Sequence, residues 1–438
     1  MTSILQALSC ADDYDPDSLP VDRARELILD LLHPVTGHER VFVRQALDRV
    51  LFEDVISPIN VPSHDNSAMD GWAVRSCDLA AGDETAGETA GETRLKNIGT
   101  AFAGRAFAGK VGAGDTVRIM TGGVLPAGVD CVVIQEVVKV EGDAVIIPPG
   151  QRSGQNIRRA GEDLQAGKAA VPAGKKLRPA EIGIIASLGI GEVSVRRRVR
   201  VAVFSTGDEL CSIGTPLAPG AVYDSNRYTL WGMLTRLGCE VIDMGVVRDD
   251  PAALEAAFRE AAACSDAIIT SGGVSVGEAD FIKQLMAQLG EVAFWKIAMK
   301  PGRPMAFGRI GKTQPDGADS PGAWLFGLPG NPVAVMVTFY QFVQPALLKL
   351  AGLDPVPTVP MFPARCSEAM KKGRGRTEFQ RGILFRENGE WCVRPTGAQG
   401  SGVLRSMADA DCFIVLEHER EKVGAGDTVM VQLMNGLV

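Results

Sequence analysis

The spacing of apolar residues changes several times along the chain, and each change predicts a different kind of element. Residues 1–19 are acidic, contain proline and offer little to bury, so we interpret them as a mobile tail. Apolar side chains then recur at helical spacing, at Ala24, Leu27, Ile28, Leu31 and Leu32. The following segment, "QALDRVLFEDV", has a similar pattern. We therefore expect an N-terminal helix near residues 20–37, with helical character continuing beyond it.

Two stretches show the period-two alternation that is typical of strands. Residues 61–167 are rich in glycine, threonine and valine, and contain the runs "DTVRIM" and "CVVIQEVVKVEGDAVIIPPG" with turn signals at "EGD" and "PPG". A proline-rich linker near residues 353–360 precedes a second β-like stretch that continues to the C-terminus. We predict a β domain over residues 61–167 and a C-terminal β domain over residues 353–438.

Residues 198–352 alternate between strand-like and helix-like segments. The predicted strands are "VRVAVFS", "CEVIDMGVV", "DAIIT", "VAFWKIAM", "PMAFGRI" and "AWLFGLP". Helices are expected over residues 224–237, after Asp250 as N-cap with Pro251 at the first helical position, in "DFIKQLMAQLG", and over residues 331–351. This order predicts a doubly wound, largely parallel α/β sheet that binds ligands beyond the carboxyl ends of its strands.

The composition narrows the class of protein. The chain of 438 residues is too long for one core, and its 45 basic and 53 acidic residues give a formal charge of -8. Nucleic acid and anionic membranes require a basic face, so neither is an expected partner. The nine cysteines include no C-x-x-C pair, and the N-terminus shows no secretory pattern, which indicates reduced thiols in a cytoplasmic protein. A histidine-built metal centre is not expected from four histidines.

The most apolar helical stretch is "NPVAVMVTFYQFVQPALLKLAG". It is interrupted by Gln341, Gln344 and Pro345, so we interpret it as a buried core helix rather than a membrane span.

The segment "ITSGGVSVGEAD", residues 269–280, follows a predicted strand and precedes a predicted helix. Its small residues suit a cradle of backbone N–H groups for an anion; they are Ser271, Gly272, Gly273 and Ser275. No lysine follows them as in a P-loop, and the segment continues into the carboxylates of Glu278 and Asp280. Amides and carboxylates together predict a large anion bridged to a hard divalent cation.

Each such cluster also has an ordinary structural explanation. A Ser-Gly-Gly sequence at a strand end is usually a tight turn. Asp249 and Asp250 at a helix start are more often caps than metal ligands. Lys300 and Arg303, around a Pro-Gly pair, can be solvated turn charges. The concentration of glycine-flanked acidic and basic residues at several strand ends nevertheless favours a ligand site.

Seven motifs together resemble one family. They are "DNSAMDGWAVR", "RIMTG", "RSGQNIRRAGED", "FSTGDEL", "SGGVSVGEAD", "KPGRP" and "GLPGNPV". In this order they are similar to the molybdopterin molybdenumtransferase (MoeA-type) family, which is related to the C-terminal part of gephyrin. The resemblance implies a homodimer with four domains per chain. It places a discontinuous domain at residues 38–60 and 168–197, and the molybdopterin-binding-like α/β domain at residues 198–352.

The resemblance also implies the chemistry. Members insert molybdate into adenylylated molybdopterin and release AMP in a Mg2+-dependent reaction of molybdenum cofactor biosynthesis. Molybdate and tungstate, two tetrahedral dianions of similar size, fit this expectation equally. An adenylylating molybdopterin protein and downstream molybdoenzyme chaperones are possible partners by the same resemblance.

The family's site residues are carried over position by position. The polar cleft, shared by the β domain and the α/β domain of a dimer, is expected at Asp70, Thr121, Glu209, Asp249 and Asp280. Among these, Glu209, Asp249 and Asp280 are the expected metal ligands. Cofactor-binding positions besides the cradle residues are Lys296, Lys300, Arg303, Pro329 and Pro332. Arg381 and Ser401 match the molybdate end, where Lys300 and Arg303 are expected on the turn after a central strand.

Two further positions, Arg158 and Asp163, match a second functional patch in the β domain. Arg303 stands where many members carry lysine, and Trp72 stands where tyrosine is common. We expect the second change to alter packing rather than chemistry. For Arg381, a surface ion pair that ties the C-terminal domain to its neighbour is the alternative to an oxyanion contact.

Two other functions remain open at this point. Gephyrin-like relatives use the fold as a scaffold that clusters a membrane receptor, so the fold alone does not establish catalysis. The adenylylation step that makes the substrate uses a related α/β domain. AMP release indicates insertion, ATP consumption indicates adenylylation, and neither indicates a scaffold.

Overall fold

The structure is a computed structural model that describes residues 19–80, 91–272, 279–311 and 322–434, without the side chains of residues 279–281. Most of the predicted N-terminal tail lies outside the described residues. The chain divides into two compact units. The first comprises residues 1–39, 48–52 and 194–438, and the second comprises residues 40–47 and 53–193. Strands β1 (His38–Phe42) and β12 (Glu192–Arg196) carry the chain between them.

The centre of the first unit is a mixed sheet. Six of the described strands form it, in the order β16 (Glu240–Val247), β13 (Arg200–Thr206), β17 (Ala267–Ser271), β21 (Ala323–Leu328), β20 (Pro304–Ile310) and β18 (Gly290–Lys296). The first four are mutually parallel, whereas β20 runs antiparallel to both of its neighbours, β21 and β18. The expected parallel sheet therefore ends at β21. Residues 297–303 are too few for a parallel crossover, which needs about a dozen residues.

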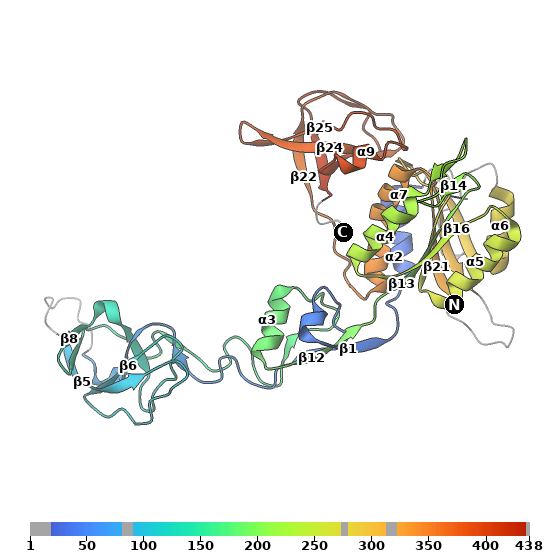
Figure 1. The fold of residues 1–438 in the computed structure, drawn as a ribbon. Helices are drawn as coiled ribbons and strands as arrows, with labels where there is room; N and C mark the ends of the chain where they lie inside the picture. Colours follow the sequence, from blue (N-terminus) through green and yellow to red (C-terminus); the bar gives the residue numbers. More distant parts are fainter. Residues whose placement is uncertain (1–18, 81–90, 273–278, 312–321, 435–438) are drawn as a thin grey trace. The chain divides into compact units, whose positions relative to one another are not determined.

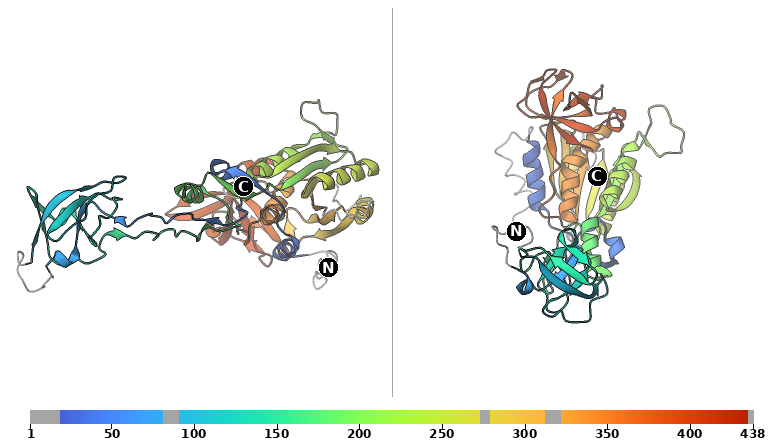
Figure 2. Two further views of the ribbon diagram at one scale, coloured as in Figure 1. Left: turned by 90° about the horizontal axis from the view of Figure 1, so that it is seen from below. Right: turned by 90° about the vertical axis from the view of Figure 1, so that its left-hand side faces the viewer.

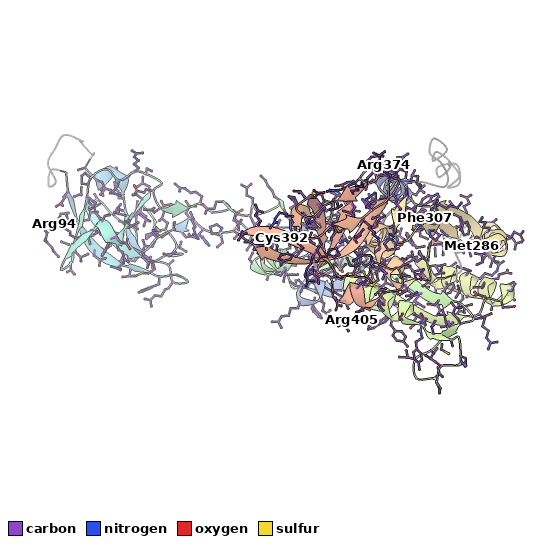
Figure 3. The ribbon with its side chains drawn as sticks, turned by 90° about the horizontal axis from the view of Figure 1, so that it is seen from above. Arg94, Met286, Phe307, Arg374, Cys392 and Arg405 are labelled. Atoms are coloured by element: carbon purple, nitrogen blue, oxygen red, sulfur yellow. The ribbon has the colours of Figure 1, made fainter. Side chains whose placement is uncertain are left out.

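Helices cover both faces of this sheet, which confirms the doubly wound fold class (Figure 1). One face carries α2 (Val21–Leu31), α4 (Ser225–Leu237), α7 (Pro332–Thr338) and α8 (Gln344–Leu350), and the other carries α5 (Pro251–Cys264) and α6 (Ala279–Leu289). Phe307 belongs to the first core and Met286 to the second (Figure 3). As predicted, the Asp250 side chain caps α5, accepting from the Ala253 N–H at 2.9 Å.

The long helix contains a π-helical turn, η5 (Phe339–Val343), between α7 and α8. A π turn leaves backbone carbonyls in need of other partners, and Arg25 of α2 donates from Nε to the Gln341 carbonyl at 3.0 Å. Residues 332–350 are long and apolar enough to span a membrane by composition, but 72% of the most apolar window is buried inside the fold. The segment therefore behaves as the core helix that its polar interruptions predict.

The C-terminal part of the first unit is a small closed sheet. Its strands are β24 (Thr377–Glu387), β25 (Glu390–Pro395), β22 (Met361–Cys366), β28 (Thr428–Leu433) and β26 (Cys412–Leu416), and β26 pairs back with β24. Short elements complete it, namely β23 (Met370–Lys371), β27 (Lys422–Val423) and α9 (Arg405–Ala408). It shares its core with the α/β domain. Phe379, Met407 and Phe413 lie in the same apolar cluster as α2, α4 and the long helix.

The second unit contains the predicted β domain. Its main sheet has the order β7 (Cys131–Ile134), β4 (Gly71–Val74), β6 (Asp115–Ile119), β5 (Thr93–Ala101), β9 (Ala144–Ile147) and β8 (Lys139–Glu141). Separate apolar clusters pack on its two faces, one around Trp72 and the other around Val117. The short strands β3 (Asn66–Ser67) and β10 (Ile157–Arg158) pair with each other, and the domain also contains the 3-10 turns η3 (Ser76–Asp78) and η4 (Gln135–Val137).

Two extended segments lead from the β domain to a smaller part of the same unit (Figure 2). They pair through β2 (Val55–Ile56) and β11 (Ala169–Val171), and the smaller part contains α3 (Pro179–Ser187). The helical continuation expected after residue 44 is wrong, because only a 3-10 turn, η2 (Val43–Ala46), forms there among the described residues. Asp48 has a left-handed backbone with φ of 63°, which a right-handed helix cannot accommodate.

Candidate functional site

In the first unit, three strand ends lie side by side. Ser205 of β13 pairs with Ser271 of β17, and Ser271 pairs with Leu328 of β21. The loops that follow these strands therefore start next to one another, at the carboxyl edge that the sequence pattern predicts. This edge brings the predicted residues Ser271, Gly272 and Pro329 together.

The described start of the predicted cradle is held tightly by its neighbours. Ser271 is buried, and its hydroxyl lies 3.5 Å from the Pro329 carbonyl. Gly272 has φ of +95°, and a Cβ there would lie 2.4 Å from the Thr206 carbonyl oxygen, so glycine is required. The Gly272 N–H donates to the Leu328 carbonyl at 3.2 Å, so that amide is already used. Gly273 and Ser275 lie outside the described residues.

Asn226 joins these loops, although sequence reasoning missed it. Its side-chain Nδ2 donates to the Ser271 hydroxyl at 2.8 Å and to the Gly330 carbonyl at 2.6 Å. Its Oδ1 is buried and has no partner among the described residues. Asn226 is the second residue of α4, two positions after the N-cap Asp224. The sequence signal that could have revealed Asn226 is a polar residue in the first turn of a helix that begins at the ligand-binding edge of the sheet.

A buried ionic cluster fixes the start of α4. Asp224 accepts from the Ser205 hydroxyl at 3.0 Å and from Arg227 Nε at 3.0 Å, and Arg227 also donates to Asp243 of β16. Desolvation works against the Arg227 charge, but these two carboxylates outweigh it and raise the pKa of the guanidinium. The cluster therefore ties β13, α4 and β16 together at the helical turn that carries Asn226.

The predicted acidic residues of this unit occupy separate loops. Glu209 is exposed, and its carboxylate folds back over Gly207, where a Cβ would lie 2.7 Å from its Oε2. Asp249 is exposed and directly precedes the cap Asp250. Asp280 lies in the first turn of α6, and its side chain is outside the description. Within the described parts of the chain, no three His, Cys, Asp or Glu side chains gather to hold a metal.

The basic residues approach the C-terminal domain. Lys296 ends β18, and Lys300 lies in β19 (Met299–Lys300), which pairs with β24. Lys300 Nζ is 3.7 Å from the buried carboxylate of Glu378. Arg303 is exposed on the same connection. Because β18 is an edge strand, the expected position of Lys300 and Arg303 after a central strand is wrong.

Arg381 is among the largest fully buried side chains of the described structure, with 1% exposure. Its Nε donates to the Ser406 hydroxyl at 3.0 Å, and an Nη donates to the Gly400 carbonyl at 3.1 Å. Desolvation lowers the pKa of the guanidinium to about 10, which leaves it charged near neutral pH. The alternative of a surface ion pair is wrong. The guanidinium instead holds the loop that carries Ser401.

Ser401 itself contacts the α/β domain. Its carbonyl accepts from the Val333 N–H at 3.0 Å, at the second residue of α7. Pro332 is the first residue of that helix and has no N–H to donate. The predicted residues Pro332 and Ser401 therefore lie together, at the start of α7.

In the β domain, Asp70 and Thr121 form a direct pair. Asp70 Oδ1 accepts from both the backbone N–H and the hydroxyl of Thr121, each at 2.7 Å. These bonds, the backbone one first, hold the pKa of Asp70 below its usual value. Both residues are exposed, so the pair presents an ionised carboxylate to solvent.

The second patch of this domain lies near the same segment. Arg158 of β10 is paired with Asn66 of β3, and Asp65 accepts from the neighbouring Ala160 N–H at 2.8 Å. Asp163 is exposed, and its N–H donates to the Val61 carbonyl at 3.0 Å. The motif around Asp70 and the motif around Arg158 are thus held side by side within the second unit.

Replacing Thr121 with valine is expected to raise the pKa of Asp70 toward 3.8, because the hydroxyl donor is lost while the backbone donor stays. Hydrogen bonds to the ionised form keep Asp70 charged at lower pH, so their loss shifts any activity that needs this carboxylate to higher pH. Titration of the Asp70 carboxyl by NMR measures the change. The carboxyl of Asp65, held by Ala160 and Arg159, is the internal control. An unchanged Asp70 titration would contradict the role of the hydroxyl.

Three regions of the chain match known families. Residues 19–189 match the MoeA N-terminal region (domain I and II), residues 202–349 match a probable molybdopterin binding domain, and residues 363–434 match the MoeA C-terminal region (domain IV). A curated Haemophilus influenzae protein named molybdopterin molybdenumtransferase is 44% identical, covering 96% of this chain and 100% of its own length. The chain belongs to the molybdopterin molybdenumtransferase family.

Further molybdopterin molybdenumtransferases and related solved structures are also similar to this chain over most of its length. A Nostoc protein of that name is 36% identical over 87% of this chain and 86% of its own. A solved structure of the molybdopterin biosynthesis moeA protein from Pyrococcus horikoshii is 27% identical with a TM-score of 0.78, covering 95% of this chain and 100% of that one. A second structure from that organism is 32% identical with a TM-score of 0.73.

Proposed function

We propose that the chain inserts molybdate into adenylylated molybdopterin and releases AMP, as a step of molybdenum cofactor biosynthesis. The observation that carries the proposal is the 44% identity to a molybdopterin molybdenumtransferase across almost the whole of both chains. The geometry agrees with it. Asn226 joins the end of β17 to the loop that follows β21 at the carboxyl edge of the sheet, where open α/β sheets bind their ligands.

The chain's own groups suit a large anion. Lys296, Lys300 and Arg303 supply positive charge on one connection, and Ser401 lies at the start of α7. We propose that Asp70, kept ionised by Thr121, accepts a hydrogen bond from the water that attacks the pyrophosphate. We now assign Arg381 a positioning role, because its described hydrogen bonds hold the Ser401 loop.

The candidate ligands of this chain provide part of a Mg2+ site. Exposed carboxylates such as Glu209 and Asp249 are the hard oxygen donors that Mg2+ takes, but no complete cage forms among the described side chains. This fits an ion that keeps several waters and binds phosphate oxygens of the substrate. When bound, it would neutralise charge that develops on the pyrophosphate. We propose Glu209, Asp249 and Asp280 as its protein ligands.

The test is the nucleotide species that the purified protein turns over. Incubated with adenylylated molybdopterin, molybdate and Mg2+, it should release AMP, measured by chromatography. ATP consumption with molybdopterin as substrate would instead identify the adenylylation step. If the protein neither releases AMP nor consumes ATP, a scaffold function is indicated. Replacing molybdate with tungstate in the same assay compares the two oxyanions.

We also propose that the protein acts as a cytoplasmic homodimer whose cleft takes residues from both chains. The candidate acidic residues are divided between the two compact units, with Asp70 in one and Asp280 in the other. Asp70→Ala and Asp280→Ala subunits should each be inactive, and mixed dimers should recover AMP release in one of their two clefts. Assembled mixed dimers that recover nothing would exclude the shared cleft. Pull-down with the adenylylating protein and molybdoenzyme chaperones tests the other proposed partners.

A further inference from the structure

Arg118 of β6 lies on an aromatic platform in the β domain. It is the cross-strand partner of Trp72 of β4, and its guanidinium carbon is 5.5 Å from the Trp72 ring centroid. Trp72 is buried at 2% exposure within the core of that face, so its ring is a fixed surface. A guanidinium over an aromatic ring loses orientational freedom before any ligand arrives.

A second contact fixes the same guanidinium. An Nη of Arg118 donates to Gln135 Oε1 at 2.7 Å, and the Gln135 N–H donates to the Asp70 carbonyl at 3.1 Å. The register of β4 with β6 also pairs Gly71 with Ile119, so Asp70 and Thr121 follow directly at the same end of the strand pair. Arg118, Asp70 and Thr121 therefore share one rim of the sheet.

Arg118 forms no direct ion pair within the described part of the chain, although its charge helps to lower the pKa of the nearby Asp70. Other arginines of this domain form such pairs, including Arg75 with Asp78, Arg94 with Glu141 and Arg159 with Asp65. The nearby Asp70 uses its Oδ1 on Thr121 instead. A guanidinium that is held by a ring and an amide, and is still partly exposed, keeps donors available for an anion.

We propose that Arg118 binds a phosphoryl group of the substrate at the rim formed with Asp70 and Thr121. The planar fork of donors matches two oxygens of a tetrahedral oxyanion. Asp70 beside it repels a bare anion, so the site favours a phosphoryl group accompanied by a divalent cation. The identity of the substrate rests on the proposed function, whereas the anion site rests on the geometry of Arg118. A purely structural Arg118 would only cover the Trp72 ring.

Chemical protection gives a readout at Arg118 itself. The full-length protein is modified with phenylglyoxal, with and without magnesium pyrophosphate, and the modified arginines are mapped by peptide mass spectrometry. Pyrophosphate with Mg2+ should slow modification of Arg118 about tenfold or more, and AMP with Mg2+ should act in the same direction. Arg94, on β5 of the same domain and labelled in Figure 3, should show no protection. Equal modification of Arg118 with and without both probes would overturn the proposal.

Kinetic measurements distinguish a role of Arg118 in substrate binding from a role in packing on Trp72. Arg118→Gln should raise the KM for adenylylated molybdopterin about ten- to a hundredfold, and Arg118→Lys should recover part of that loss through its charge. Arg94→Gln is the matched control and should behave as wild type. A lower Tm with unchanged KM in Arg118→Gln would show that Arg118 only covers Trp72. Protection of Arg118 in a protein that releases no AMP would uphold the anion site and refute the proposed function.

Discussion

Replacing Asp249 with asparagine is expected to lower Mg2+-dependent AMP release about a hundredfold or more while leaving the fold intact. The substitution is nearly isosteric and the side chain is exposed, so packing should hardly change. A hard cation, in contrast, loses an anionic ligand. The same result is expected for Asp280→Asn. Initial rates of AMP release across a range of Mg2+ concentrations measure the effect, and circular dichroism monitors the fold.

The adjacent residue supplies a matched control. Asp250 caps α5 through the Ala253 N–H, and asparagine caps helices about as well as aspartate. Asp250→Asn should therefore keep a rate close to wild type. If Asp249→Asn also keeps the wild-type rate, Asp249 is not a metal ligand. If both variants lose activity equally, the charge at the start of α5 matters rather than one specific carboxylate.

Replacing Arg381 with alanine is expected to destabilise the first unit by on the order of 3 kcal/mol or more. The loss removes the Arg381 donor from the Ser406 hydroxyl and one of the two donors from the Gly400 carbonyl, and it opens a cavity. Unfolding in urea, followed by fluorescence, measures the change. Faster hydrogen exchange at residues 396–406 should show that the loop is released first.

A surface arginine of the same domain is the comparison. Arg374, labelled in Figure 3, is 68% exposed and pairs with Glu421. Its replacement by alanine should change stability by less than about 1 kcal/mol. An Arg381→Ala protein as stable as Arg374→Ala would contradict the buried clamp. If Arg381 acts through the loop, excess molybdate should not restore activity; restoration would return Arg381 to direct contact with the oxyanion.

The parts of the fold that the sequence predicts are those set by local chemistry. Asp250 and Pro251 start α5 at the expected residues because an N-cap and a first-turn proline act within one helical turn. The strand ends of the α/β sheet were predictable for a similar reason, since an apolar run that meets Ser271 and Gly272 must leave the sheet there. The family resemblance then supplied the names of site residues that no local pattern distinguishes.

The parts that the sequence did not predict depend on contacts between distant segments. Arg381 reads as a surface charge in "GRGRTEFQRG", and only the closure of the C-terminal sheet around Ser406 buries it. Lys300 was expected after a central strand. The strand that precedes it lies at the sheet edge instead, and the order of strands in a sheet cannot be recognised from the sequence of one strand. Asn226 needed α4, β17 and β21 to be placed together before its two hydrogen bonds could be recognised.

The shared apolar core of the first unit has a consequence for synthesis of the chain on the ribosome. Leu27 and Ile28 of α2 are made early, but the surface that buries them begins at Val199, after the whole second unit. At about 5–20 residues per second, α2 therefore waits on the order of ten seconds with its apolar face uncovered. Phe413, which belongs to the same core, arrives only near the end of translation. A nascent chain paused before that point should bind holdase chaperones, whereas the released full-length chain should not.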